Sequence, residues 1–428
     1  MTDLALSGPG GSFTADVRVP GDKSLSHRAL LFAGMAPGDS VITGLGTGVD
    51  IASTAAALID LGVSISGTAG VEHQVRSPGV GEWTTPAHPI DCGNSGTTMR
   101  LLAGVLSTSA VGTTLVGDES LSRRPMERLI DPLRSLGGAI ETTDGTAPLT
   151  VGGTGGAHGA EVVIPMASAQ VRTAFALAAL AADGPSTIDS PGGFRDHTER
   201  WLAAAGRGAW ESDTRFRVDP GDLPPARYEV PGDPSSAAFL WTCAAIHPGA
   251  QITTPGISLN PGRLGFLEVL GRMGVQVDAE VTGETGGDPV GSVTVTGGPL
   301  TATMVEGDLV ASALDELPLL GVLGAYAEGI TSVRDAAELR SKESDRIASV
   351  VGMIRALEGG AEERPDGFDV VGTGVLEGGT VATHHDHRIA MAAAVAATRA
   401  QGTVVIEDAD VAAVSWPGFY GTLEGLWS

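Results

Sequence analysis

The sequence predicts an α/β protein with two domains, each assembled from copies of one repeated unit. Its 428 residues are too many for one core and suit two domains of roughly 200 residues each. One order of small-residue turn, Ala/Leu-rich stretch, glycine and β-branched run occurs six times along the chain. A proline-rich segment, Leu223–Pro231, separates the third copy from the fourth.

The repeat is visible from six anchor positions, each in a turn that precedes an Ala/Leu-rich stretch. The anchors are Lys23, Asn94, Ser168, Asp233, Asp315 and Asp386. Successive anchors are 71, 74, 65, 82 and 71 residues apart. Ala-rich helices can resemble one another by chance, but the near-constant spacing and the common order of elements argue against coincidence.

Each Ala/Leu-rich stretch is predicted to be a helix that ends at a glycine C-cap, and the run after it to be a strand. The expected capping glycines are Gly38, Gly112, Gly184, Gly249, Gly329 and Gly402. A second helix ends in Leu-x-x-x-Gly at Leu58–Gly62, Leu133–Gly137, Leu202–Gly206 and Leu270–Gly274, with a looser copy from Ile354 to Gly359. Each repeat therefore reads strand–helix–strand–helix–strand–strand.

The sixth repeat stops early, so we expect an N-terminal strand, Phe13–Val19, to complete it. That pairing would bring both ends of the chain into one domain. We accordingly predict one domain of residues 21–229, with repeats one to three, and one of residues 1–20 plus 230–428, with repeats four to six.

The composition limits the classes of function. The formal net charge is −25, and no basic stripe is present, which argues against nucleic-acid binding. No apolar run approaches the roughly 20 residues of a membrane span, and the N-terminal residues lack the regions of a signal peptide. Two cysteines, Cys92 and Cys243, cannot by themselves form a disulfide framework or a zinc site. We expect a cytoplasmic protein.

Basic residues are few and almost all are arginine. Only Lys23 and Lys342 are lysines among the 26 Lys and Arg residues, and only Asn94 and Asn260 are asparagines. Genomic bias explains why lysine and asparagine are scarce. It also makes the two lysines conspicuous, because arginine occupies the basic positions where arginine can serve as well as lysine. Both lysines lie in the motifs described next.

The anchors immediately precede predicted helices, whose N-termini carry unpaired N–H groups and bind anions. Ser24 and Arg28 are one helical turn apart and suit a carboxylate or phosphate, although a capped helix with a surface arginine is the alternative. Gly96, in the small-residue loop 93–98, allows close approach of a ligand, and a plain loop is the alternative. The basic residues in these motifs are Lys23, Arg28, Arg124, Arg195, Lys342, Arg346 and Arg388.

Two carboxylates stand out as an acid/base pair. Asp315 lies in an apolar stretch, and Glu343 lies in the charged run Leu339–Arg346. A solvated helix face is the alternative for the charged run. His384 and His387 have an i, i+3 spacing, but we expect no metal there because the segment matches the other anion motifs.

Nine segments, taken in order, resemble the 5-enolpyruvylshikimate-3-phosphate (EPSP) synthase family over essentially the whole chain. They are PGDKSLSHRALL, GNSGTTMRLL, RRPM, PMASAQVRTA, RDHTE, VPGDPSSAAF, DELPLL, SKESDRI and HDHRIAM. The resemblance implies two inside-out, barrel-like α/β domains of three βαβαββ repeats each, with helix N-termini facing the cleft between them.

The resemblance also implies an activity. Members of the family transfer the enolpyruvyl group of phosphoenolpyruvate to the 5-hydroxyl of shikimate 3-phosphate and release phosphate, a step of chorismate biosynthesis. They need no metal or organic cofactor. We therefore expect two small anionic substrates, no nucleic-acid or membrane partner, and a monomer.

The family's functional residues transfer to this sequence position by position. For shikimate 3-phosphate the resemblance implies Lys23, Ser24, Arg28, Ser168, Ala169 through its backbone, Gln170, Arg195, Asp315 and Lys342. For phosphoenolpyruvate it implies Lys23, Asn94, Gly96, Arg124, Gln170, Arg346 and Arg388. Lys23 would touch both substrates at the reacting centre, Asp315 would be the base at the 5-hydroxyl, and Glu343 would protonate the methylene carbon, with the division between the two carboxylates left open.

One position departs from the family pattern. Many members carry a lysine where this chain has Val414, and some branches lack it as well. Two alternatives stay in view: the sister transferase that acts on UDP-N-acetylglucosamine, and a non-catalytic anion-binding paralogue. Cys92 precedes a phosphate-type loop instead of lying on the mobile loop of the sister enzyme, and the retention of Lys23, Asp315, Glu343 and Arg388 argues against the paralogue.

Overall fold

The computed structural model describes residues 2–68, 71–166, 168–192 and 195–428. The chain divides into two compact units. The inner unit contains residues 21–231 and 284–288, and the terminal unit contains residues 1–20, 232–283 and 289–428. Each unit has its own buried hydrophobic core.

Three four-stranded mixed sheets belong to the inner unit, in the orders β14-β3-β5-β4, β6-β7-β9-β8 and β10-β11-β13-β12. Their strands are β3 (Gly38–Thr43), β4 (Ser64–Thr68), β5 (Glu72–Ser77), β6 (Ile90–Asp91), β7 (Thr113–Val116), β8 (Ile140–Thr143), β9 (Thr146–Val151), β10 (Glu161–Val163), β11 (Ser186–Asp189), β12 (Gly208–Trp210), β13 (Arg215–Val218) and β14 (Arg227–Glu229). In each sheet the first pair is parallel and the others are antiparallel.

The terminal unit has two four-stranded sheets, in the orders β16-β17-β15-β2 and β18-β19-β21-β20, and one three-stranded sheet, in the order β1-β23-β22. Its strands are β1 (Leu4–Leu6), β2 (Thr14–Asp16), β15 (Gln251–Ser258), β16 (Gln276–Thr285), β17 (Asp288–Thr296), β18 (Met304–Val305), β19 (Gly329–Val333), β20 (Gly360–Arg364), β21 (Gly367–Gly372), β22 (Gly379–Val381) and β23 (Val404–Ile406). The first residue of β17 and the last two of β16 are counted with the inner unit.

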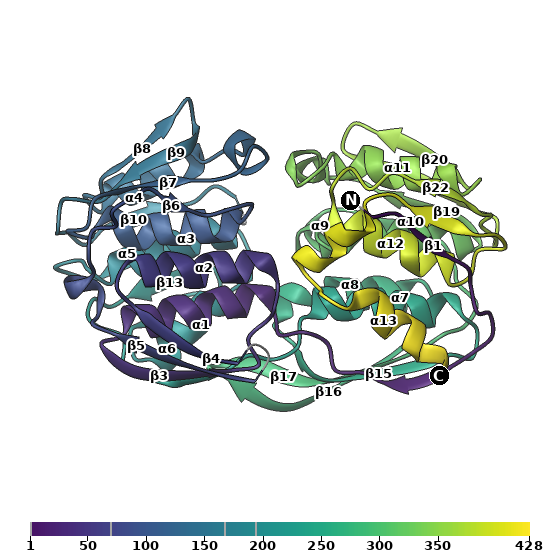
Figure 1. The fold of residues 1–428 in the computed structure, drawn as a ribbon, viewed down its shortest axis with the longest axis horizontal. Helices are drawn as coiled ribbons and strands as arrows, with labels where there is room; N and C mark the ends of the chain where they lie inside the picture. The colour runs from purple at the N-terminus through teal and green to yellow at the C-terminus, as the bar shows by residue number, and fades with distance from the viewer. Residues whose placement is uncertain (1, 69–70, 167, 193–194) are drawn as a thin grey trace. The chain divides into compact units, whose positions relative to one another are not determined.

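The first helix of every repeat is almost completely buried. These helices are α1 (Lys23–Met35), α3 (Gly96–Ser107), α5 (Ala169–Ala179), α7 (Pro234–Ile246), α10 (Leu317–Tyr326) and α12 (His387–Ala397). In Figure 1, α1 lies next to β3 and β5 within the inner unit, and α7, α10 and α12 are grouped in the terminal unit. Their Ala-rich and Leu-rich sequences suit burial on all sides.

The second helices are less completely buried and face solvent on one side. They are α2 (Val49–Asp60), α4 (Ile130–Ser135), α6 (His197–Ala204), α8 (Gly265–Arg272) and α11 (Arg346–Ala356), and two further short helices are α9 (Asp308–Ala313) and α13 (Phe419–Glu424). The glycines after α2, α4, α6 and α8 have φ values from 69° to 96°, which is the left-handed conformation of a glycine C-cap. The βαβαββ order and the α/β class predicted from the sequence are confirmed.

The glycines that follow the first helices are not the C-cap residues of those helices. The C-cap residues of those helices are Ala36, Thr108, Leu180, His247, Ala327 and Thr398. Each predicted capping glycine lies two to four residues further on, in the turn or at the start of the next strand. The prediction of glycine C-caps for the first helices was therefore wrong.

The leading strands of repeats one and four come from distant parts of the chain. β14 follows repeat three yet pairs in parallel with β3 of repeat one. β2 lies within the predicted strand Phe13–Val19, but it pairs in parallel with β15 of repeat four, so its assignment to repeat six was wrong. The sixth sheet is completed by β1, which runs antiparallel to β23. Segments this short owe their pairing to tertiary neighbours, because three residues contain too little pattern to select a partner.

Candidate active site

Lys23 is the first residue of α1, directly after the N-cap residue Asp22. The Asp22 carboxylate accepts from the N–H of Leu25 at 2.8 Å and so fixes the start of the helix. The Lys23 ammonium forms an ion pair with the carboxylate of Asp50, in the first turn of α2. The side chain of Lys23 is 28% exposed, so the ammonium is anchored by one carboxylate and also reaches the surface.

Threonine hydroxyl groups connect α1, α2 and α3. His27 Nδ1 lies 2.7 Å from Oγ1 of Thr54, which lies 2.7 Å from Oγ1 of Thr98. Thr98 also donates from its backbone N–H to the N-cap residue Ser95 at 3.2 Å. Burial lowers the pKa of His27 to about 3, and Lys23 and Arg28 add to this against the opposing effect of Asp50. A neutral imidazole thus belongs to a chain of contacts that links three helices.

Arg28 is a buried cation held by uncharged oxygens. Its Nε donates to Oγ1 of Thr198 at 2.7 Å and its Nη2 donates to Oγ1 of Thr173 at 2.8 Å. Its Nη1 donates to the carbonyl of Ser24 at 2.9 Å, as the predicted one-turn spacing requires. A guanidinium has five N–H donors, so this arrangement orients the group and leaves donors for an anion. Burial lowers the pKa of Arg28 to about 10, with carboxylates such as that of Glu199 acting in the opposite direction.

Asn94 and Arg124 form a second group in the inner unit. Arg124 Nη2 donates to Oδ1 of Asn94 at 2.5 Å and to Oγ of Ser120 at 3.2 Å. Asn94 Nδ2 in turn donates to Asp118 at 2.6 Å. Gly96 opens α3, and a Cβ atom there would lie 2.9 Å from Nη1 of Arg100 and 3.6 Å from Nη1 of Arg124. The absence of a side chain at Gly96 gives both guanidinium groups room.

The start of α5 connects these two groups. Ser168 is its N-cap residue and Ala169 its first residue. Gln170 Oε1 accepts from Nη1 of Arg100 at 2.8 Å, and Gln170 Nε2 donates to Thr97 at 3.1 Å. Gln170 and Thr173 are three residues apart and share one face of α5. This face therefore accepts hydrogen bonds from Arg100, through Gln170, and from Arg28, through Thr173.

Arg195 completes the inner-unit set. It directly precedes Asp196, the N-cap residue of α6, and is half-buried. Its charge is close enough to that of Arg28 to lower the pKa of Arg28. Most of the predicted residues of this unit lie at or directly before the starts of α1, α3, α5 and α6: Lys23, Ser24, Asn94, Gly96, Ser168, Ala169, Gln170 and Arg195. Arg28 lies one turn further along α1, and Arg124 follows a 3-10 helix and contacts Asn94.

In the terminal unit, Arg346 lies among three carboxylates and is only 1% exposed. Its Nε donates to Asp386 at 2.8 Å, and its Nη2 donates to Oε2 of Glu343 at 2.5 Å. Its Nη1 lies 3.6 Å from Oδ1 of Asp315. Burial alone would lower the pKa of Arg346, but the three carboxylates, Asp386 first, outweigh it and raise the pKa. Burial likewise opposes ionisation of Asp386, yet Arg346 keeps the pKa of that carboxyl below its usual range.

Arg388 and Lys342 complete the terminal-unit set. Arg388 Nη1 donates to the carbonyl of Asp315 at 2.7 Å, and its Nη2 lies 3.9 Å from the carboxylate of the same residue. Lys342 Nζ donates to Glu338 at 2.7 Å across the predicted i, i+4 spacing. The charged run is not one helix face: a 3-10 helix ends at Ser341 and α11 begins at Arg346, so Lys342 and Glu343 lie in the turn between them.

Several polar residues of these networks were not among the predicted site residues. They are Asp50, Arg100, Asp118, Thr173, Thr198, Glu199 and Asp386. Buried polar side chains inside apolar helices, such as Thr173, offer a weak signal in sequence, because their partners are defined only by packing. Asp386 was recognised as a repeat anchor, but no partner for it could be deduced from spacing.

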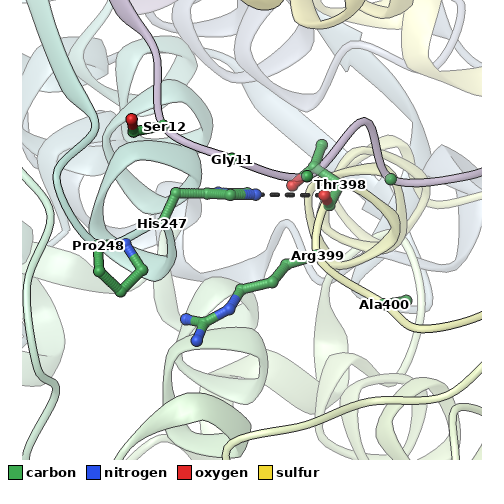
Figure 2. Close-up of a pocket in the computed structure, with 9 residues that line it drawn as sticks. Gly11, Ser12, His247, Pro248, Thr398, Arg399 and Ala400 are labelled. Atoms are coloured by element: carbon green, nitrogen blue, oxygen red, sulfur yellow. Dashed lines mark hydrogen bonds between the residues drawn. The ribbon is translucent and has the colours of Figure 1, made fainter.

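A cavity of about 210 Å³ lies in the terminal unit and is lined by Gly8, Gly10, Gly11, Ser12, His247, Pro248, Thr398, Arg399 and Ala400. All nine residues differ from the predicted site residues. Figure 2 shows His247 and Arg399 at its wall, with a ring nitrogen of His247 3.2 Å from the carbonyl of Thr398. The Arg399 guanidinium donates to the carbonyl of Ile246 and so caps the last turn of α7. These contacts give the wall a structural role.

The described residues form neither a metal-binding cluster nor a membrane-spanning helix. In the part of the chain that the structure describes, His, Cys, Asp and Glu side chains form no group of three or more that could hold a metal ion. His385 is instead paired with Asp408 at 2.5 Å. None of the helices within the described ranges combines the length and apolar character that a membrane span needs.

Comparison with known proteins identifies the family to which the chain is similar. Residues 8–423 match the family model described as EPSP synthase (3-phosphoshikimate 1-carboxyvinyltransferase). The chain belongs to the EPSP synthase family. The resemblance inferred from the nine sequence segments is thereby confirmed.

Relatives within the EPSP synthase family are similar along their whole length. The 3-phosphoshikimate 1-carboxyvinyltransferase of Herpetosiphon aurantiacus is 45% identical over 412 residues, which cover 94% of this chain and 95% of the relative. The enzyme of the same name from Acidithiobacillus ferrooxidans is 43% identical over 412 residues, covering 96% and 95%. A solved EPSP synthase structure from Acinetobacter baumannii matches with a TM-score of 0.88 and 37% identity, covering 99% of this chain and 98% of that one.

Proposed function

We propose that this chain is a 3-phosphoshikimate 1-carboxyvinyltransferase. It transfers the enolpyruvyl group of phosphoenolpyruvate to the 5-hydroxyl of shikimate 3-phosphate and releases phosphate, as a step of aromatic amino-acid biosynthesis. The observation that carries this conclusion is the match of the EPSP synthase family model to residues 8–423. Relatives of that name at 43% to 45% identity agree with it.

We assign shikimate 3-phosphate mainly to the inner unit. Arg28 is a cation oriented by neutral oxygens and suits the carboxylate of the substrate. The N-terminus of α5, with Ser168, the backbone of Ala169 and Gln170, suits the 3-phosphate together with Arg195. Lys23 and Ser24 complete this set at the start of α1.

We assign phosphoenolpyruvate to residues of both units. In the inner unit these are Lys23, Asn94, Gly96, Arg124 and Gln170, and the fixed position of Arg124 against Asn94 supports the assignment. In the terminal unit they are Arg346 and Arg388, which present guanidinium groups suited to a phosphate or a carboxylate.

The chemical step needs an acid and a base. Protonation of the methylene carbon leaves positive charge at C2 of the enolpyruvyl group. The 5-oxygen bonds to C2 as its own proton leaves, and phosphate then departs from C2 as the new methyl group returns a proton. We propose Asp315 as the base at the 5-hydroxyl and Glu343 as the group that protonates carbon. Lys342 touches the substrates beside them, and Lys23 and the arginines stabilise the departing phosphate.

The contacts of Arg346 support these roles. Its guanidinium binds Glu343 at 2.5 Å and lies 3.6 Å from Asp315, so one buried group holds both carboxylates in place. The buried Asp386 fixes the guanidinium in turn. Acid/base groups held by a buried partner keep the geometry that proton transfer requires.

The predicted domain assignment, oligomeric state and compartment belong to the same proposal. We assign residues 21–229 to shikimate 3-phosphate binding and residues 1–20 with 230–428 to the catalytic carboxylates and part of the phosphoenolpyruvate site. We propose a cytoplasmic monomer that works without cofactor. The buried thiols of Cys92 and Cys243 are both free, as is usual in a reducing compartment. Light scattering at micromolar concentration tests the monomer, and dialysis against a chelator tests the independence from metal.

A phosphate-release assay tests the function. The purified chain should release phosphate from phosphoenolpyruvate in the presence of shikimate 3-phosphate, and Glu343→Gln should release it far more slowly. Release with UDP-N-acetylglucosamine in place of shikimate 3-phosphate would identify the sister transferase. Binding of both substrates without release would identify a non-catalytic paralogue.

A further inference from the structure

The tip of one hairpin is built into the inner unit. β16 and β17 are neighbouring strands, and residues 284–288 at their turn are counted with the inner unit. Thr285 Oγ1 donates to the carbonyl of Glu229 at 2.9 Å. Arg200 Nη1 donates to the carbonyl of Gly287 at 3.0 Å. We call residues 284–288 the hairpin tip.

Asp288, the last residue of the hairpin tip, contacts the start of α6. Its Oδ2 accepts from Nδ1 of His197 at 3.0 Å, and both side chains are 0% exposed. Its Oδ1 lies 3.8 Å from Nε of Arg200. A carboxylate is only an acceptor, so this contact fixes the proton of His197 on Nδ1 and the orientation of the ring. His197 is the first residue of α6, and the hairpin tip therefore holds the N-terminus of this helix.

The next residue of α6 holds Arg28. Thr198 Oγ1 accepts from Nε of Arg28 at 2.7 Å and lies 2.7 Å from Oγ1 of Thr173, which accepts from Nη2 of Arg28. Both threonines are buried, at 0% and 1% exposure. A shift of α6 by a fraction of an ångström would therefore move an acceptor of the guanidinium.

The same carboxylate acts on Arg28 through its charge. Burial lowers the pKa of Arg28, and Glu199, Asp22 and Asp288 are the carboxylates that oppose this effect. Glu199 is itself engaged by Arg172 at 2.6 Å, with both side chains buried. Asp288 thus reaches Arg28 by two routes, through the position of Thr198 and through the charge that favours the protonated guanidinium.

We propose that Asp288 and His197 are positioning residues for shikimate 3-phosphate, because they place Thr198 and, through it, the guanidinium of Arg28 that binds the substrate carboxylate. This inference rests on the proposed function, in which Arg28 has that role. A hairpin that needed only anchoring would be held at least as well by apolar side chains, since a buried charged pair adds little net stability.

The first test compares Asp288→Asn with the wild-type enzyme. The substitution keeps the shape of the side chain and one acceptor for His197, but it removes the charge. We expect Kd for shikimate 3-phosphate, measured by calorimetry, to rise about tenfold, the size of one lost charged hydrogen bond. KM for phosphoenolpyruvate and kcat should each change by less than about twofold, because no contact to that substrate is removed.

The matched control is Glu284→Gln. Glu284 lies in the same hairpin tip and carries the same charge, but it is exposed. Its removal should leave Kd for shikimate 3-phosphate unchanged. A rise equal to that of Asp288→Asn would mean that the net charge of the hairpin matters and would overturn the proposal.

A substrate analogue separates positioning from general loosening of the fold. The analogue carries a hydroxymethyl group where shikimate 3-phosphate carries its carboxylate. Wild type and Asp288→Asn should bind this analogue with equal affinity, because Arg28 then has no carboxylate to bind. If Asp288→Asn weakens binding of the analogue as much as binding of the substrate, the effect is structural and the proposal is wrong.

Two variants of His197 provide an independent readout if Asp288→Asn does not fold. His197→Asn keeps an N–H donor near the position of Nδ1 and should keep the wild-type Kd, whereas His197→Leu should raise it. Equal affinity of both folded variants would overturn the positioning role. A wild-type enzyme that does not bind shikimate 3-phosphate at all would overturn the proposed function, and this inference with it, before any variant is compared.

Discussion

Nε of Arg346 donates to the carboxylate of Asp386 over 2.8 Å, and neither side chain is more than 1% exposed. The pair joins the first residue of α11 to the N-cap residue of α12. Asp386 also accepts from the N–H of Arg388 at 2.9 Å. One buried carboxylate therefore sets the positions of two arginines that we assign to phosphoenolpyruvate.

We expect Arg346→Gln to lower both stability and activity. Removal of the guanidinium leaves the buried Asp386 without its cation, which costs about 3–5 kcal/mol of the free energy of unfolding. Turnover should fall at least 100-fold, by roughly the amount that a lost charge contact in a transition state costs. Urea unfolding and the phosphate-release assay measure the two effects. Arg272→Gln is the control, because its pair with Glu268 is exposed and its loss should cost less than about 1 kcal/mol.

Lys23→Arg should abolish turnover without unfolding the protein. The Lys23 ammonium is a compact charge beside Asp50, and a planar guanidinium cannot occupy the same point. Misplacement by about 1 Å costs on the order of 100-fold in rate. The thermal midpoint should move by less than 2 °C or so, because the side chain reaches solvent. Near-normal phosphate release from this variant would refute a special role for the lysine.

Glu343→Gln should lower kcat and leave substrate binding nearly unchanged. The amide keeps a contact to Arg346 but cannot deliver a proton, and general-acid catalysis contributes typically 10²–10⁴-fold, so kcat should fall by about that factor. Steady-state kinetics with both substrates provide the measurement. Glu362→Gln, at an exposed site paired with Arg364, serves as the control. An unchanged kcat for Glu343→Gln would assign the protonation of carbon to another group.

His27 should make the stability of the protein depend on pH between about 3 and 6.5. The pKa of its buried imidazole is about 3, whereas the same imidazole in an unfolded chain has its usual pKa of 6.5. Between these values the unfolded state binds one more proton, so stability falls as pH falls, by about 1.4 kcal/mol per pH unit from this residue. This contribution is fully present above pH 6.5 and is lost progressively toward pH 3.

Urea unfolding at a series of pH values measures this contribution. His27→Gln has no titrating ring, so its plot of unfolding free energy against pH should be shallower than that of the wild type between pH 5 and 6.5 or so. His88→Gln is the control because His88 is exposed. Equal slopes for wild type and His27→Gln would show that the ring titrates alike in both states.

Local sequence patterns predicted the repeated elements well, because helix and strand periodicity, N-caps and glycine turns act within a few residues. The anchors Asp233 and Asp386 are N-cap residues that accept backbone N–H groups two residues ahead, as anchor positions before helices should. The spacing of Ser24 and Arg28 likewise produced the contact expected of one helical turn.

Local sequence patterns could not predict the contacts between residues far apart in the chain. The three residues of β2 fit an edge position in any of the sheets, and only their contact with β15 decides which. In the sequence Arg100 resembles an ordinary helical arginine. Its hydrogen bond to Gln170, 70 residues further along the chain, is visible only in the structure. Asp50 as the partner of Lys23 and Asp386 as a partner of Arg346 were missed for the same reason, since each belongs to another helix.

The pairings of β1 and β2 set an order of events during synthesis on the ribosome. β2 must wait for β15, and β1 must wait for β23, so the first residues to be made are among the last to be ordered. Residues 21–231 meanwhile contain three complete sheets and need only the hairpin tip in addition. Nascent chains should therefore fold residues 21–231 first, pair β2 once β15 has been made, and leave β1 unpaired until β23 appears near the end of translation.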